Sequence, residues 1–142
     1  MYEIYHANCI QYLRQIPTQS IDFICTDSPY NLRQYSTGNL TVKGRAPINN
    51  DIAEWDVNFD PKDIQEDFIR VLKPTGNIFA FCSYNLIGRW HELFDPIFDT
   101  FHVFVWHKTN PTPKFRKAGF LNSCEFIFQA PGLKPSPLGE QL

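Results

Sequence analysis

Short apolar runs alternate with amphipathic segments along most of this chain, and this alternation constrains the fold more than any other feature. Residues 21–26, 77–82, 101–106 and 121–129 have the character of strands, and the first is typical of a strand covered on both faces. Segments with apolar residues at helical spacing lie between them. Strands that alternate with helices predict a largely parallel sheet, with ligands bound outside the carboxyl ends of the strands.

Three of the amphipathic segments predict helices. The first follows Asn8, whose side chain can cap it, and the second follows Asp60, with Pro61 at the first helical position. Proline would end the first at residue 17, and residues 74–76 would end the second. A third helix is expected at residues 84–94. The apolar stripe of the first helix is Ile10, Leu13 and Ile16, and that of the second is Ile64, Phe68, Val71 and Leu72. The stripe of the third is Ile87, Trp90 and Phe94.

Some segments carry weaker signals. Residues 2–5 alternate weakly, as a strand would, and residues 31–57 read as a long polar loop. Aromatic residues of the strand segments are more often core than platforms for a base, and we expect Phe79, Phe81, Phe104 and Trp106 in the core.

The length of 142 residues and the apolar content of 43% predict one packed domain over residues 1–132, followed by a loose tail over residues 133–142. The four cysteines are far apart and lack metal-ligand spacing, so neither a zinc site nor a disulfide framework is expected. No apolar stretch reaches the roughly 18 residues of a membrane span. These features predict a soluble cytoplasmic protein without a metal.

Charge is segregated along the chain although the net charge is only −2. Residues 33–50 and 107–124 hold bases and no acid, whereas residues 51–67 hold seven acids against Lys62 alone. Such segments can be ordinary solvated faces, or they can contact nucleic-acid phosphates. The basic residues are Arg33, Lys43 and Arg45 in the first segment, and Lys108, Lys114, Arg116 and Lys117 in the second.

The turn Asp27-Ser28-Pro29-Tyr30 follows the first apolar run directly and is the strongest candidate site. The Asp27 carboxylate and a backbone carbonyl of Ser28 or Pro29 supply two acceptors that can converge on one amine, and Tyr30 supplies an aromatic face. The exocyclic amine of a nucleic-acid base could be held in this way, but only after the base leaves the duplex stack. The alternative is a plain turn, in which Asp, Ser and Pro are common for conformational reasons.

Residues 20–31 resemble the catalytic motif of DNA adenine-N6 and cytosine-N4 methyltransferases, which is usually Asp-Pro-Pro-Tyr or Ser-Pro-Pro-Tyr. Similar segments follow in family order at residues 54–56, 72–77, 106–111, 120–122 and 125–128, so the resemblance covers about residues 2–132. It implies a Rossmann-like α/β sheet that is mostly parallel with an antiparallel last strand. It also implies Asp27, Ser28, Pro29 and Tyr30 as catalytic residues, with S-adenosylmethionine as the methyl donor.

The order of the motifs along the chain indicates which subgroup of this family the sequence resembles. Only 26 residues precede Asp27, which leaves no room for the glycine-rich donor-binding strand, and no Phe-x-Gly-x-Gly follows. This order is similar to the permuted β-group, with residues 1–132 as its catalytic half and an incomplete sheet. Asn8 and Cys9 stand where relatives help to hold the donor, and Asp27 completes the donor-side candidates. The sequence departs from the family pattern at two positions. Asn8 replaces a carboxylate, and Ser28 replaces the first proline of the motif. The second replacement predicts a loosened turn.

The resemblance assigns the seven basic residues above to contacts with double-stranded DNA, and Asp27 in first place favours adenine N6 over cytosine N4. We therefore expect site-specific methylation of a flipped base. A second polypeptide carrying the donor-binding motif, or a homo-oligomer, would complete the enzyme. The alternatives are an inactive remnant that binds DNA or protein, and a fragment of a longer enzyme.

Overall fold

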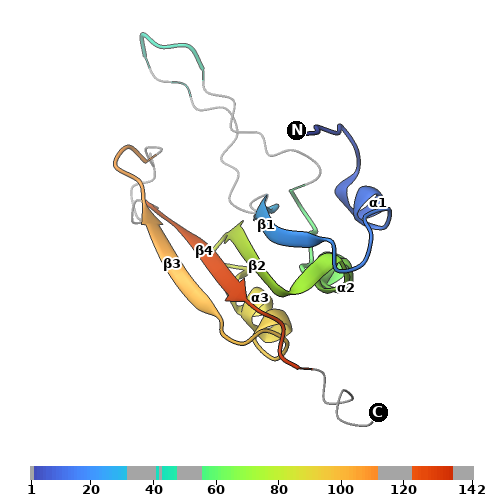
Figure 1. Ribbon diagram of the computed structural model, residues 1–142. Helices are drawn as coiled ribbons and strands as arrows, with labels where there is room; N and C mark the ends of the chain where they lie inside the picture. The colour runs from blue at the N-terminus through green and yellow to red at the C-terminus, as the bar shows by residue number, and fades with distance from the viewer. Residues whose placement is uncertain (1, 32–40, 42, 48–55, 112–122, 136–142) are drawn as a thin grey trace, which may run out of the picture.

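The computed structural model describes residues 2–31, 41, 43–47, 56–111 and 123–135. Its elements are α1 (Cys9–Leu13), β1 (Ile21–Asp27), α2 (Lys62–Val71), β2 (Leu72–Cys82), α3 (Ile87–Phe94), β3 (His102–His107) and β4 (Cys124–Pro131), as Figure 1 shows. Helices and strands alternate up to β3, as the sequence predicted. Within the described residues, none of the helices has the length and apolar character that a bilayer crossing needs.

The four strands form one mixed sheet in the order β1-β2-β4-β3. The β1 and β2 strands pair in parallel, whereas β4 pairs antiparallel with both β2 and β3. Three strands therefore run in one direction, and the last strand in the sequence runs against them. This confirms the expected mixed α/β sheet, in which the chain must cross over between parallel strands through a helix.

The core lies on one face of this sheet. Trp90 and Phe94 of α3 pack on Phe128 of β4, with ring centroids 4.7 Å and 5.7 Å from that of Phe128. The apolar stripe of α2 contributes Ile64 and Phe68 to the same cluster. The stripes predicted for α2 and α3 are thus the surfaces that these helices bury.

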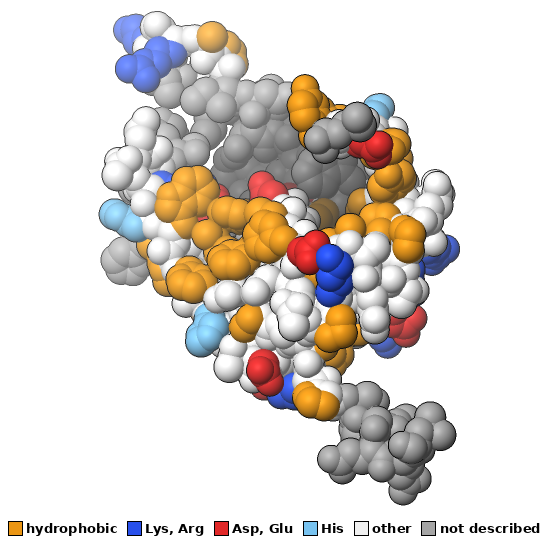
Figure 2. Space-filling model, in the orientation of Figure 1, with side chains coloured by type: hydrophobic (Ala, Val, Ile, Leu, Met, Phe, Trp, Pro, Cys, Tyr) orange, Lys and Arg blue, Asp and Glu red, His pale blue; other side chains and the backbone are white. Residues whose placement is uncertain are grey.

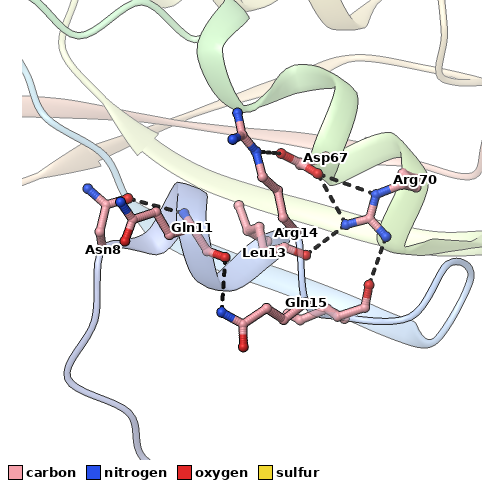
Figure 3. Close-up of polar contacts among 8 residues, drawn as sticks. Asn8, Gln11, Leu13, Arg14, Gln15, Asp67 and Arg70 are labelled. Carbon is pink, nitrogen blue, oxygen red and sulfur yellow. Dashed lines mark hydrogen bonds and ion pairs between the residues drawn. The ribbon is translucent and has the colours of Figure 1, made fainter.

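Helix α1 is fixed by its cap and by α2 (Figure 3). The Asn8 side chain accepts a hydrogen bond from the Gln11 N–H at 3.2 Å, as predicted for an N-cap. At the other end, the Arg70 guanidinium donates to the carbonyls of Leu13 and Ile16, each at 2.7 Å, and pairs with Asp67 at 3.1 Å. These bonds satisfy carbonyls that the end of a short helix leaves without partners.

Several sequence expectations on local structure are wrong. Residues 2–5 form no strand, and β2 begins at Leu72, directly after α2, rather than at residue 77. Helix α2 ends at Val71, ahead of Pro74 as expected, but the Pro74–Gly76 region then lies inside β2, where its register with β1 shifts between Ile21 and Phe23. Proline and glycine therefore produce an irregular strand here, which is a known alternative to a turn.

The sheet face opposite the core carries a row of aromatic side chains, which we call the aromatic face: Phe23, Phe79, Phe81, Phe104 and Trp106. Phe23 is 52% exposed, so the expectation that residues 21–26 form a strand covered on both faces is wrong. Phe104 and Trp106 are 46% and 48% exposed, so their expected place in the core is wrong as well. The rings contact one another, with centroids 5.6 Å apart for Phe23 and Phe79 and 6.2 Å for Phe79 and Phe104. Figure 2 shows hydrophobic side chains gathered over the strands.

Candidate functional site

The turn of residues 27–30 lies at the carboxyl end of β1, where the neighbouring parallel strand β2 also ends. Asp27 is the last residue of β1 and stands opposite Phe81 of β2, with an exposed side chain. The structure thus places the motif at the sheet edge where α/β proteins bind ligands.

Ser28 is held firmly at this edge, contrary to the expectation that it loosens the turn. Its hydroxyl donates to the Phe81 carbonyl at 2.9 Å, and its backbone N–H approaches the same oxygen at 3.4 Å. A proline at this position has neither donor. The serine therefore replaces ring rigidity with a tether to β2, and its side chain is buried.

Tyr30 and Asn31 are held by residues from outside the motif. The Asp56 carboxylate accepts the N–H groups of both, with 2.8 Å to the Asn31 nitrogen, and the Ser83 hydroxyl donates to the Tyr30 carbonyl at 3.0 Å. Asn31 has a left-handed φ of 54°. Its side-chain amide bonds both backbone groups of Phe59, at 2.8 Å and 2.9 Å, which stabilises this conformation.

Two backbone carbonyls of the turn have no partner within the part of the chain that the structure describes. Among the described residues, no hydrogen-bond donor lies on the carbonyls of Ser28 or Pro29. These are the carbonyls expected to accept an amine together with Asp27. The surrounding groups of the turn are bonded, so the open carbonyls lie on a fixed backbone.

Beside the turn is a small pocket formed by the ends of β2, β3 and β4. In it the Tyr30 hydroxyl lies 3.4 Å from the Glu125 carboxylate, and Lys108 forms an ion pair with that carboxylate. The Lys108 ammonium also lies 5.5 Å from the centre of the Trp106 ring. The lining residues are Tyr30, Cys82, Ser83, Tyr84, Lys108, Cys124 and Glu125.

Electrostatics keep the Tyr30 phenol protonated. Burial raises its pKa above the usual value, and the neighbouring Asp27 and Glu125 carboxylates raise this pKa further. The phenol can therefore donate a hydrogen bond, and its ring presents a neutral aromatic face. Burial likewise raises the pKa of the Cys82 thiol, to about 12, so this pocket thiol is not a nucleophile at neutral pH.

None of the three predicted donor-side residues lines this pocket, although Asp27 lies beside the Tyr30 side chain. Asn8 and Cys9 are exposed at the start of α1, and the Asn8 oxygen is occupied by the helix cap. Within the described parts of the chain, no group of three or more His, Cys, Asp or Glu side chains could hold a metal ion.

The structure describes only part of the predicted DNA-contacting set. Lys43 and Arg45 are exposed in residues 43–47, where Figure 2 shows basic side chains at the end of the molecule. Lys108 faces Glu125 instead of projecting freely, a contact that the basic pattern of its segment did not indicate. The remaining candidates, Arg33, Lys114, Arg116 and Lys117, lie outside the described residues.

Sequence reasoning missed three side chains that the site uses, namely Asp56, Ser83 and Glu125. Ser83 follows β2 directly, so its place at the carboxyl end of a parallel strand was a usable signal. Glu125 is an acid inside an apolar strand, which is a second signal. Asp56 is one of seven acids in a charged segment, and although residues 54–56 resemble a family segment, nothing in that segment indicates a contact with the motif turn.

Comparisons with known proteins agree on one family. A family model for N6/N4 methyltransferases, described as DNA methylase, matches residues 21–135. The Type II methyltransferase M2.LlaDCHI of Lactococcus lactis subsp. cremoris is 32% identical over 133 residues, which are 88% of this chain and 48% of that protein. Type II methyltransferase M2.MboI of Moraxella bovis is 30% identical over 137 residues, covering 91% and 49% respectively.

The fold is similar to that of M1.HpyAVI. The crystal structure of the M1.HpyAVI-SAM complex aligns with a TM-score of 0.57 at 23% identity, over 93% of this chain and 55% of that one. A second crystal structure of M1.HpyAVI gives a TM-score of 0.56 at 22% identity. This chain therefore spans about half the length of the relatives that it matches.

Proposed function

The chain belongs to the N6/N4 DNA methylase family, and on that basis we propose that it is the catalytic half of a cytoplasmic DNA methyltransferase. The proposed reaction transfers a methyl group to adenine N6, or to cytosine N4, of a base flipped out of double-stranded DNA. The observation that carries this proposal is the motif turn, with the Asp27 carboxylate and two open carbonyls at the end of β1.

These acceptors suit an exocyclic amine. The lone pair of such a nitrogen is delocalised into the base ring, so the amine reacts when its N–H groups are held by acceptors and the nitrogen can pyramidalise. Asp27 and a carbonyl of Ser28 or Pro29 would hold the two N–H groups, and Tyr30 would stack on the flipped base. Adenine is favoured by the aspartate in first place.

The donor would be S-adenosylmethionine, which is bound in the crystal structure of the M1.HpyAVI-SAM complex. When bound, this cofactor supplies an electrophilic methyl group on a sulfonium. The residues here fit only the rim of such a site: Asp27 is exposed at the end of β1, and Asn8 and Cys9 are exposed at the start of α1. Their role in this chain is to border the donor rather than to enclose it.

Two features support a second component that encloses the donor. The β1 strand pairs only with β2 among the described strands, so one of its edges is open, and the aromatic face is uncovered. The relatives are about twice as long as this chain. We therefore propose a second polypeptide with the donor-binding motif as the partner, and a second copy of this chain is the alternative that a sizing measurement would reveal.

DNA would be held by the basic segments. Lys43 and Arg45 are exposed, and with Arg33, Lys114, Arg116 and Lys117 they would contact phosphates, which gives affinity without sequence selection. Lys108 would contact DNA beside the pocket, because its ion pair with Glu125 holds it there.

The test is the Asp27→Ala variant in a mixture of this chain with the part of M2.MboI outside the matched region. Methyl transfer should fall on the order of 100- to 1000-fold, as for loss of one preorganised electrostatic group, while DNA affinity stays unchanged. Asp22→Ala is the matched control, because Asp22 is on the same strand and its partner among the described residues is Lys73, at the surface.

An equal loss in both variants would show that the effect is not specific to the motif. Unchanged transfer in Asp27→Ala would contradict the proposed role of this carboxylate. DNA binding without transfer in any mixture would favour the alternative function, a remnant that only binds DNA.

A further inference from the structure

In the described part of the chain, few polar side chains are buried, and those that are buried lie at or beside the motif turn. Among the described residues, the buried polar or charged side chains are Ser28, Asp56 and Ser83. Each makes a hydrogen bond to the backbone at the motif turn or to the strand beside it. Burial of a polar group is costly unless it is hydrogen-bonded, so this concentration at one turn points to a requirement for its geometry.

Asp56 makes the most demanding of these contacts. One of its carboxylate oxygens, Oδ1, accepts the backbone N–H groups of both Tyr30 and Asn31. The two donors are 26 and 25 residues away in the sequence, so this is a tertiary contact and not a local turn. Charge-assisted bonds of this kind are stronger than neutral ones, and these two fix the orientation of two successive peptide groups, 29–30 and 30–31.

Ser83 bonds the other backbone polar group of Tyr30. Its hydroxyl donates to the Tyr30 carbonyl at 3.0 Å, so both backbone polar groups of Tyr30 bond to side chains from outside the motif. The direction of the Tyr30 ring follows from this backbone, and its hydroxyl lies at Glu125 across the pocket. Neither the Asp56 nor the Ser83 bonds involve Asp27 or the open carbonyls.

We propose that Asp56 is a positioning residue for the motif, with Ser83 as its counterpart, and this inference rests on the proposed methyl-transfer function. Asp56 sets the peptides of residues 29–30 and 30–31, and thereby the Pro29 carbonyl directly and the Ser28 carbonyl and the backbone of Tyr30 next to it. It does not contact the base. Loss of its acceptor would misplace the reacting groups while leaving the groups themselves in the protein.

The experiment compares Asp56→Ala with Asp56→Asn, because asparagine keeps one oxygen that can accept both N–H groups. In the reconstituted mixture, Asp56→Ala should lower kcat on the order of 100-fold, the effect of a misplacement of about 1 Å, with little change in KM for DNA. Asp56→Asn should recover most of this kcat. Asp67→Ala is the control, since Asp67 pairs with Arg70 and Arg14 at the junction of α1 and α2.

A second readout uses the chain alone and does not depend on methyl transfer. Hydrogen exchange measured by NMR should show the amides of Tyr30 and Asn31 protected in the parent chain and in Asp56→Asn. In Asp56→Ala both should exchange as in an unstructured peptide, while β2 amides stay protected. Protection that survives Asp56→Ala, or a kcat loss in Asp67→Ala equal to that in Asp56→Ala, would overturn the inference.

The two readouts separate this inference from the proposed function. If the parent mixture transfers no methyl group, the proposed function fails, and the exchange measurement still decides whether Asp56 holds the turn. If the parent mixture is active and Asp56→Ala is equally active, the function stands and the positioning role is wrong.

Discussion

At the scale of single residues, the contacts of side chains outside the motif decide how the motif works. The sequence identified the turn of residues 27–30, but it predicted that Ser28 would loosen it. The Ser28 hydroxyl instead bonds Phe81, a partner that depends on the parallel register of β1 and β2. Asp56 was equally hidden, because its donors lie at the far end of a long segment. Tertiary partners of this kind have no local signature.

Replacement of Ser28 by alanine tests this tether. Ser28→Ala removes the hydroxyl donor to the Phe81 carbonyl and should lower the free energy of unfolding by about 1 kcal/mol, the usual net value of one hydrogen bond. Urea denaturation followed by tryptophan fluorescence measures this change. Ser20→Ala, which removes an exposed local bond to the Pro17 carbonyl, should cost less, and an equal cost would contradict the tether.

At the scale of elements, periodicity and capping signals predicted the helices and their buried faces correctly, because these features are decided by residues close together in the sequence. The Asn8 cap and the buried faces of α2 and α3 are found as predicted. The burial of the strands was predicted wrongly. An apolar run such as residues 21–26 predicts a strand with both faces covered, but it does not show which elements would cover those faces. The Phe23 side chain is exposed because the described residues place helices on the other face of the sheet only.

Cysteine reactivity tests this arrangement of faces. Cys9 and Cys25 are exposed, whereas Cys82 is buried and its thiol pKa is raised to about 12. Iodoacetamide at neutral pH should therefore label Cys9 and Cys25 in the folded chain, and should label Cys82 only after denaturation. Peptide mass spectrometry gives the labelled positions. Labelling of Cys82 at the rate of Cys25 in the folded chain would contradict the placement of the core.

At the scale of the whole molecule, three features support the proposed second component: a β1 edge that no other described strand pairs with, the aromatic face, and the match to about half the length of the relatives. The chain holds the residues proposed to receive the base, and relatives have about as much again beyond the matched region. Motif order predicts that a second component supplies the donor site, because no Phe-x-Gly-x-Gly occurs in the sequence, and this stays a prediction. What the sequence could not predict is the aromatic surface, because exposure of a sheet face depends on which helices pack against it.

The measurement that tests the central claim most directly is methylation of DNA by separate and mixed components. This chain, the part of M2.MboI outside the matched region and their mixture would each be incubated with S-adenosylmethionine and double-stranded DNA, and the nucleosides analysed by mass spectrometry. We expect N6-methyldeoxyadenosine from the mixture and none from either component. Methylated product from this chain alone, or no product from the mixture although both components are folded and bind each other, would contradict the account.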